Sequence, residues 1–199
     1  MKLYFSPGAC SMAGHILFNE WNIPHQLERV DLKTHQTEKG EDFYQINPKG
    51  YVPTLRLDNG QILTENIAIL TYISDVKAAV KGDRYQYLEW MAFISTELHK
   101  GIGSLFGYPN GPEDVVKGIK EKIAKRLKVM DHHLAGKEFV WADAFSAADA
   151  YLVTVLGWVP MLKVDLSPYK NINAYLKRIM ARPSIEKTLE QEGLTAAKK

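Results

Sequence analysis

Cysteine is almost absent from this sequence, since Cys10 is the only one among 199 residues. A single thiol excludes an intramolecular disulfide and leaves no cysteine set for zinc. A dithiol C-x-x-C pair is also excluded, because residue 13 is Ala13. Any thiol that reacts with Cys10 must therefore come from outside the chain, and a small thiol cofactor is the simplest hypothesis. A reducing cytoplasm fits one free cysteine best.

The sequence also lacks an excess of charge and a long apolar run. Its 25 basic and 23 acidic side chains give a formal net charge of +2, too little to attract nucleic acid or an anionic membrane surface. No stretch approaches the roughly 20 apolar residues that span a bilayer. His15, His25 and His35 lack metal-ligand spacing, so we expect no metal. The composition, 46% hydrophobic and 24% charged, is that of an ordinary soluble globular protein.

The first 75 residues alternate strand-like and helical patterns. "KLYF" predicts a strand, after which Met12, Ile16 and Leu17 recur at helical spacing until Asn22-Ile23-Pro24 ends the pattern. "QLERV" predicts a second strand, which a right-handed crossover would place parallel to the first. The first unit therefore begins with a β-α-β arrangement.

A hairpin and a helix complete this unit. In "PTLRLDNGQILTE" the residues Asp58-Asn59-Gly60 lie between two apolar runs, and Asn-Gly predicts a tight turn whose two central residues both have positive φ. A helix should follow from Glu65. The order β-α-β, loop, β-β-α indicates an α/β domain over residues 1–76.

The chain after Asp75 shows helical patterns only. A short connection leads to a second domain, residues 83–199, which we expect to be all-helical. The expected helices lie near residues 83–107, 112–135, 146–160, 170–181 and 184–192.

Cys10 lies in "SPGACSM", where the first predicted strand passes into the first helix. Unpaired N–H groups and the positive end of a helix dipole lower a thiol pKa and favour thiolate. The Ser11 hydroxyl adds a donor for a sulfur anion. The alternative is a small buried hydrophobic residue, the usual role of a free cysteine, and position alone does not separate the two.

Two further stretches describe the ligand that such a thiol site would take. In "NPKGYVPTL", a cis Val52-Pro53 bond would leave the Val52 N–H and C=O for an extended peptide, although a trans turn is the commoner form. In "LTENIAIL", Glu65 and Asn66 lie at a helix N-terminus, which suits a carboxylate and an ammonium group. Ordinary helix capping is the alternative for this pair.

These stretches resemble the glutathione S-transferases, specifically the bacterial beta class. The resemblance runs from Met1 to about Leu194 and is specific in "MKLYFSPGACSMA", "INPKGYVPTL", "LTENIAIL", "TELHKG" and "FSAADAYL". It implies a thioredoxin-like α/β N-terminal domain that binds glutathione, and an all-α C-terminal domain with an apolar cleft for electrophiles. It also implies a cytosolic homodimer and a role in detoxification.

The resemblance also implies site residues. It places Cys10 at the glutathione sulfur, Val52 and Pro53 at the cysteinyl backbone, and Glu65 with Asn66 at the γ-glutamyl end. The remaining polar contacts that it implies are Lys33 and His99.

His99 lies in "TELHKG" on the long first helix of the second domain, and the resemblance brings it over the thiol site. An imidazole there would donate to a sulfur anion or, with an ordinary pKa of about 6.5, accept the thiol proton. A hydrogen-bonded helix histidine is the alternative. In "FSAADAYL", Ser146 and Asp149 predict a capping box at a helix start.

The sequence departs from the family at three positions. Asn66 replaces the usual serine, Phe5 replaces the usual tyrosine, and Ala92 replaces an asparagine that in relatives reaches toward the partner subunit's glutathione. Phe5 removes a phenol that would activate sulfur. The connection after Asp75 is also shorter than usual.

The sequence thus predicts a glutathione transferase that stabilises the thiolate of glutathione and conjugates it to small apolar electrophiles, with Cys10, Ser11 and His99 as catalytic residues. Two alternatives stay open. Cys10 would itself form a mixed disulfide in thiol-disulfide exchange or peroxide reduction, or the protein would be a non-catalytic glutathione- or ligand-binding regulator on the same fold.

Overall fold

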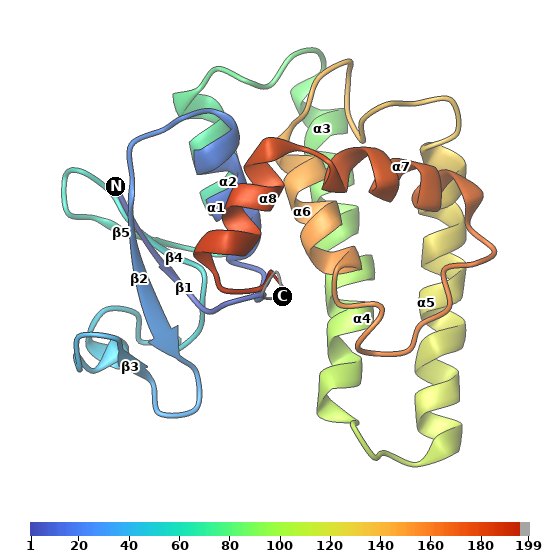
Figure 1. Cartoon of the computed structure of the whole chain (residues 1–199), viewed down its shortest axis with the longest axis horizontal. Helices are drawn as coiled ribbons and strands as arrows, with labels where there is room; N and C mark the ends of the chain where they lie inside the picture. Colours follow the sequence, from blue (N-terminus) through green and yellow to red (C-terminus); the bar gives the residue numbers. More distant parts are fainter. Residues whose placement is uncertain (196–199) are drawn as a thin grey trace. The chain divides into compact units, whose positions relative to one another are not determined.

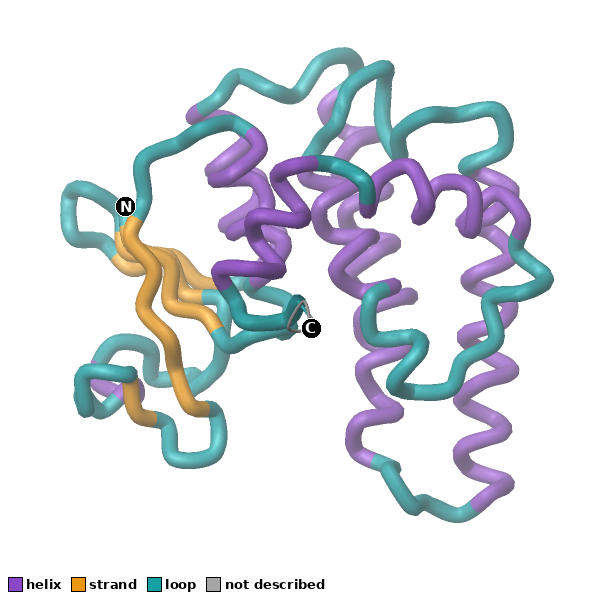
Figure 2. Tube along the Cα trace, in the orientation of Figure 1, coloured by secondary structure: helices purple, strands orange, loops and turns teal. Residues whose placement is uncertain are grey.

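The structure is a computed structural model that describes residues 1–195 and forms two compact units. The first unit joins Met1–Ala79 to the chain from Ala181 onwards, and the second is Val80–Met180. Figure 1 labels the elements of both, and Figure 2 shows that the strands belong to the first unit.

The first unit is built on a five-stranded mixed sheet of order β3-β2-β1-β4-β5. The strands are β1 (Lys2–Phe5), β2 (Gln26–Asp31), β3 (Gln36–Thr37), β4 (Thr54–Arg56) and β5 (Ile62–Thr64). β1 pairs parallel with β2 and antiparallel with β4, so that Leu3 lies opposite Leu27 and Leu55. The predicted β-α-β, β-β-α order is confirmed, while the two-residue β3 is too short to leave a sequence pattern.

The hairpin between β4 and β5 forms where it was predicted, but its turn differs. Gly60 has a φ of 86°, whereas Asn59 does not take positive φ. The Gly60 N–H donates to the Leu57 carbonyl and the Leu57 N–H to the Gln61 carbonyl. The loop therefore has three residues rather than two, and only its last residue must be left-handed.

Three helices belong to the first unit: α1 (Met12–Glu20), α2 (Asn66–Val76) and α8 (Pro183–Gln191). α1 and α2 approach β1 closely at Gly14, where a Cβ atom would lie 3.7 Å from Ile73 and 3.8 Å from Leu3. A second cluster consists of Tyr4, Val30, Phe43 and Val52. Phe43 lies in a short 3-10 helix, η1 (Phe43–Gln45).

The second unit contains no strand among its residues, all of which are described. One continuous helical run comprises α3 (Arg84–Phe93), the π-helix η2 (Ile94–His99), α4 (Lys100–Ser104) and the 3-10 helix η3 (Leu105–Gly107). It is followed by α5 (Glu113–His133), α6 (Ala147–Leu156) and α7 (Lys170–Met180). The thioredoxin-like and all-helical fold classes are confirmed, and the predicted helices lie within a few residues of the observed ones.

α6 forms the core of the second unit, since all ten of its residues are buried. It begins at the predicted capping box. Asp149 Oδ2 accepts from the Ser146 N–H at 2.9 Å, and Oδ1 accepts from the Val140 N–H at 2.8 Å and the Tyr175 hydroxyl at 3.0 Å. Three segments therefore meet on one buried carboxylate: α6 with its N-cap, the loop at Val140, and α7.

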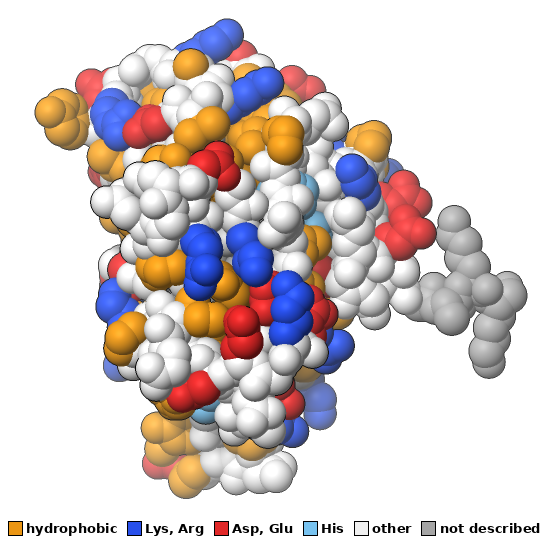
Figure 3. Space-filling view, turned by 90° about the vertical axis from the view of Figure 1, so that its left-hand side faces the viewer, with side chains coloured by type: hydrophobic (Ala, Val, Ile, Leu, Met, Phe, Trp, Pro, Cys, Tyr) orange, Lys and Arg blue, Asp and Glu red, His pale blue; other side chains and the backbone are white. Residues whose placement is uncertain are grey.

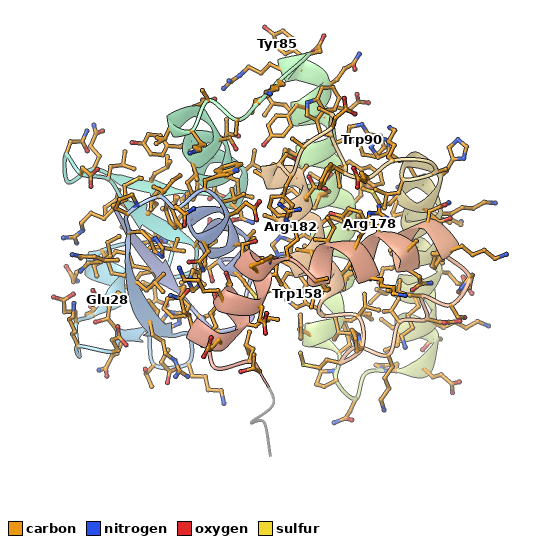
Figure 4. All side chains as sticks on the ribbon, turned by 45° about the horizontal axis from the view of Figure 1, so that its top comes forward. Glu28, Tyr85, Trp90, Trp158, Arg178 and Arg182 are labelled. Carbon is orange, nitrogen blue, oxygen red and sulfur yellow. The ribbon has the colours of Figure 1, made fainter. Side chains whose placement is uncertain are left out.

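The structure divides the chain differently from the predicted domains at the C-terminal end. The predicted second domain ran over 83–199, but α8 packs against α1 of the first unit, and residues 196–199 lie outside the described residues. Asn19 Nδ2 donates to Thr188 Oγ1 at 2.9 Å, and Arg182, labelled in Figure 4, forms an ion pair with Glu20. Helical periodicity predicts the helix α8, but it does not predict which unit α8 packs against.

Within the described residues, no helix is both long and apolar enough to cross a membrane. Figure 3 shows acidic and basic side chains interspersed on the face in view, in keeping with a net charge of +2.

Candidate active site

Cys10 lies in a turn two residues before α1 begins. The turn is closed by hydrogen bonds from the Ala9 N–H to the Ser6 carbonyl and from the Met12 N–H to the Ala9 carbonyl, both 3.0 Å. The Cys10 Sγ lies 3.5 Å from the Val52 carbonyl oxygen, to which the thiol donates. Cys10 is therefore at a helix start, as predicted, and in contact with Val52.

The predicted lowering of the Cys10 pKa is wrong. Burial raises the pKa of the Cys10 thiol to about 11, while the backbone N–H groups of Cys10 and Ser11 lower it by less, and the negative charge of Glu65 raises it further. The bond to Val52 needs the S–H proton, which also favours the thiol form. Cys10 is therefore a neutral thiol at neutral pH.

Ser11 is fully buried, and its hydroxyl serves the turn rather than an open site. Its Oγ accepts from the Ser6 N–H and donates to the Ser6 carbonyl, each at 3.3 Å. The predicted role of this hydroxyl as a donor to a sulfur anion is not what the geometry shows, because its proton is already used within the turn.

A buried group that sequence reasoning missed holds the same turn from the residue that follows α8. The Glu192 carboxylate accepts from the Gly8 N–H at 2.8 Å and bonds His15 Nδ1 at 2.9 Å, and both side chains of the pair are fully buried. Gly8 has a φ of 70°, and a Cβ atom there would lie 3.7 Å from Leu194. No local pattern links residues so far apart in sequence.

The Val52-Pro53 peptide bond is cis, as the strand-addition hypothesis required. Val52 is buried, and its carbonyl is the acceptor for Cys10. Pro53 leads directly into β4. The backbone of Val52 therefore lies at the thiol.

Glu65 and Asn66 lie at the start of α2, as predicted. Glu65 has a φ of 70°, a strained conformation for a residue with a side chain. Its Oε1 accepts from Lys49 Nζ and from the Tyr51 hydroxyl, each at 2.6 Å. Lys49 and Tyr51 were missed, because a lysine and a tyrosine in a loop carry no signal of their own.

Asn66 replaces the usual serine of the family, and its side chain is buried. Both its Nδ2 and its Oδ1 are buried without a hydrogen-bond partner among the described residues. A buried amide normally satisfies both atoms, so this site has an unused donor and an unused acceptor.

Lys33 lies in an exposed turn after β2. Its backbone N–H donates to Asp31 Oδ1 at 2.7 Å. Among the described residues, the Lys33 side chain makes no hydrogen bond or ion pair with Cys10, Val52 or Glu65. No such contact therefore links Lys33 to these candidate site residues.

His99 lies in the second unit, at the last position of the π-helix η2. Its Nδ1 is 2.6 Å from the hydroxyl of Tyr151, which is fully buried on α6. Its ring is 5.0 Å from that of Trp158, which follows α6 (Figure 4). Burial, with a smaller effect of the Lys100 charge, lowers the pKa of His99 to about 4. His99 is therefore a neutral imidazole, and the expectation of an ordinary pKa is wrong.

The first unit thus brings together a thiol, a peptide backbone and a helix start with a carboxylate. Together with the fold, this group of residues defines a class of protein. Its members have a thioredoxin-like domain with a cysteine at the start of the first helix, joined to an all-helical unit. Such a site suits a small peptide thiol.

Comparison with known proteins identifies the family. The glutathione S-transferase N-terminal domain matches residues 8–76, and the glutathione S-transferase C-terminal domain matches residues 93–183. The glutathione S-transferase GstA of Escherichia coli O157:H7 is 39% identical over 201 residues, covering 98% of this chain and 100% of its own. The chain belongs to the glutathione S-transferase family.

Solved structures agree with this assignment. A bacterial beta-class enzyme from Sphingomonas chungbukensis is 40% identical with a TM-score of 0.90, over 98% of this chain and 100% of its own. A sphingomonad glutathione S-transferase complexed with glutathione is also 40% identical, with a TM-score of 0.91 and the same coverage. The predicted family, class and transferase activity are confirmed.

Proposed function

We propose that this protein binds glutathione in its first unit, stabilises the thiolate of the tripeptide and conjugates it to small apolar electrophiles. The observation that carries the proposal is the grouping of Cys10, Val52, Glu65 and Asn66, with the Cys10 Sγ 3.5 Å from the Val52 carbonyl. These groups match the sulfur, the cysteinyl backbone and the γ-glutamyl end of glutathione.

The γ-glutamyl end is zwitterionic, and the start of α2 offers partners for both charges. The Glu65 carboxylate suits the ammonium group, while Lys49, 2.6 Å from Glu65, suits the carboxylate. The buried donor and acceptor of Asn66 have no other partner among the described residues, which supports a ligand at this position.

The neutral Cys10 favours conjugation over disulfide exchange. The one S–H proton of Cys10 lies on the Val52 carbonyl in the free protein, and it would turn to the sulfur anion of glutathione when the tripeptide binds. Exchange would instead need the Cys10 thiolate as the attacking group, and burial disfavours that form. Cys10 therefore acts as a donor to the reacting sulfur.

The second unit supplies the surface for the electrophile. Rings of His99 and Phe106 lie 5.0 Å and 5.7 Å from that of Trp158, and Phe106 is exposed. An aromatic cluster suits a small apolar compound. His99 and Lys33 are assigned as further glutathione contacts on the family resemblance.

We further propose that two copies form a homodimer in the cytoplasm, where conjugation would remove toxic electrophiles. One free cysteine suits a reducing compartment. Light scattering of the purified protein should give twice the mass of one chain, and a monomer would contradict the dimer.

Retention on immobilised glutathione followed by conjugation of an aryl halide tests the function. Glu65→Gln should weaken glutathione binding about tenfold or more, because the ammonium loses a charged partner. The matched control is Glu41→Gln, an exposed carboxylate of the same unit. Retention without turnover would indicate a binding protein, and no retention would refute the proposal.

Cys10→Ala separates conjugation from exchange. Conjugation should fall by no more than about tenfold, a barrier change near 1.4 kcal/mol, because the attacking sulfur belongs to glutathione. Reduction of a glutathione mixed disulfide, where it occurs, should be lost. Equal loss of both activities would contradict this division and make Cys10 essential to a step that the two reactions share.

A further inference from the structure

A chain of hydrogen bonds inside the first unit joins α1 to the end of α8, which lies beside it (Figure 1). At its centre is His15, a fully buried residue of α1. Its Nδ1 lies 2.9 Å from Glu192 Oε1, and its Nε2 lies 2.9 Å from Gln191 Oε1. The proposed conjugation does not use this imidazole, and the partners of its two nitrogens decide which protons it carries.

The far end of the chain fixes the direction of the bond at Nε2. Thr188 Oγ1 lies 2.7 Å from the Ser184 carbonyl, which only accepts, so the Thr188 proton is used there. The Asn19 group 2.9 Å from Thr188 Oγ1 must then be a donor, the NH2. The same NH2 lies 2.8 Å from Gln191, so the Gln191 atom at that place is the oxygen. His15 Nε2 faces this oxygen and must donate to it.

The other ring nitrogen must donate as well. Glu192 offers Nδ1 a carboxylate oxygen, and an imidazole holds its proton more strongly than a carboxylate does, with ordinary pKa values of about 6.5 and about 4.3. Reversing the Asn19 amide does not change this assignment. It would turn Asn19 Oδ1, which has no hydrogen-bond partner among the described residues, against Thr188 Oγ1.

We infer that His15 carries a proton on both ring nitrogens at neutral pH and acts as a pH-sensitive latch, which fastens the end of α8 to α1 and releases it when one proton is lost. The imidazolium neutralises the buried Glu192 carboxylate, which accepts from the Gly8 N–H in the turn of Cys10. A neutral ring would set a lone pair against an oxygen of Gln191 or Glu192 and leave a buried charge unpaired. Loss of the same proton therefore removes the support of the thiol turn.

The groups that pack on the His15 ring from other elements differ from Glu192 in their charge. Phe5 of β1 lies 6.0 Å away, ring to ring, and His25 meets the ring edge-on at 5.8 Å. Burial lowers the pKa of His25, and the charges of His15, Lys187 and the Met1 amino group lower it by less, so His25 is neutral at neutral pH and above. Glu192 is therefore the charged partner of the ring.

Two further groups near the latch keep one charge state between about pH 7 and 9. Arg182 forms an ion pair with Glu20 between the same two helices. Burial raises the pKa of Glu20, but the hydrogen bonds of Arg182 and Ser184 together lower it more, so this carboxylate stays ionised. Burial raises the pKa of Cys10 to about 11, so its thiol keeps its proton.

Nitrogen NMR detects both protons directly. Long-range proton–nitrogen spectra of the unchanged protein at neutral pH should show His15 with Nδ1 and Nε2 both protonated. One unprotonated nitrogen in this ring would overturn the inference, whether or not the protein binds glutathione.

Amide hydrogen exchange tests the release. An imidazole in water gives up its second proton above about pH 6.5, so opening of the latch above that pH frees one proton and is favoured as the pH rises. The opening constants at Gly8 and Glu192, corrected for the intrinsic pH dependence of exchange, should rise by up to about tenfold per pH unit above pH 7. They should level off where the His15 nitrogen signals titrate. Opening constants that do not change between about pH 7 and 9 would refute the latch.

His15→Gln and His25→Gln form a matched pair of variants. The first removes the titrating ring, so the opening constants should be higher at neutral pH and should no longer depend on pH. The second removes the neutral neighbour and should keep the pH dependence of the unchanged protein. Equal pH dependence in all three proteins would assign it to another group, such as the Met1 amino group, and refute the inference. If His15→Gln fails to fold, the nitrogen spectra of the unchanged protein still decide.

Discussion

Cys10 in the first unit and His99 in the second are both kept neutral by burial, but they are held by different kinds of partner. Cys10 donates to a backbone carbonyl, and its turn is closed by backbone hydrogen bonds and by the bond from the Gly8 N–H to Glu192. His99 is held by the side chain of Tyr151. The acceptor of Cys10 is a backbone atom and stays when the side chain of Val52 is changed, whereas the partner of His99 is lost when Tyr151 is replaced.

The two units also differ in how much stability a single substitution should remove. The largest loss is expected in the second unit. Asp149→Ala should lower the free energy of unfolding by about 3 kcal/mol or more, because it removes the acceptor of the buried N–H groups of Val140 and Ser146 and the 3.0 Å bond from the Tyr175 hydroxyl. Urea denaturation measures this. The control Asp165→Ala removes an exposed turn carboxylate and should change stability by under about 0.5 kcal/mol.

In the first unit, Glu192→Ala should cost about 2 kcal/mol and loosen the Cys10 turn. The change removes the carboxylate that bonds the partly buried Gly8 N–H and the buried His15. Urea denaturation gives the stability, and amide hydrogen exchange reports the turn. Glu190→Ala, an exposed residue of α8, is the matched control. If both variants have the stability and the hydrogen exchange of the unchanged protein, the Cys10 turn does not depend on Glu192.

Alkylation tests the neutral state of Cys10. The pH at which iodoacetamide reacts at half its maximal rate should lie near 11 in the folded protein and near 8.5 in urea, where the same thiol is exposed. At neutral pH the folded protein should react at least about tenfold more slowly. A half-maximal rate below pH 8.5 in the folded protein would mean that Cys10 readily forms a thiolate. That result would again favour thiol-disulfide exchange.

The smallest effect is expected for His99, whose ring resonances should stay constant between about pH 5.5 and 8. Burial lowers the pKa of His99 to about 4, so its protonation lies below this range. In the unfolded protein the same ring should titrate near 6.5. Proton NMR of the folded protein makes the measurement, and a transition near pH 6.5 would contradict a neutral, buried His99.

The parts of this molecule that a sequence can predict are those set by neighbours along the chain. The capping box of Ser146 and Asp149, the hairpin at Gly60 and the start of α2 at Glu65 all follow from short patterns. The positions of the main strands and helices follow from apolar periodicity for the same reason.

Features that depend on distant contacts could not be predicted. The Cys10 pKa moves in the opposite direction from the helix-dipole expectation, because burial outweighs the backbone N–H groups and burial is a property of the whole fold. The partner of His99 lies 52 residues away, and that of His15 lies 177 residues away. Residue type predicted that these histidines need partners, but not which ones.

The bond from Gly8 to Glu192 also bears on synthesis. Gly8 is made before the second unit, but the carboxylate that holds it follows the whole of that unit. At about 5–20 residues per second, the gap of 184 residues leaves the turn without its partner for roughly ten seconds or more. A nascent chain can therefore build most of the sheet early, but the thiol turn acquires its final support only after Glu192 has left the ribosome.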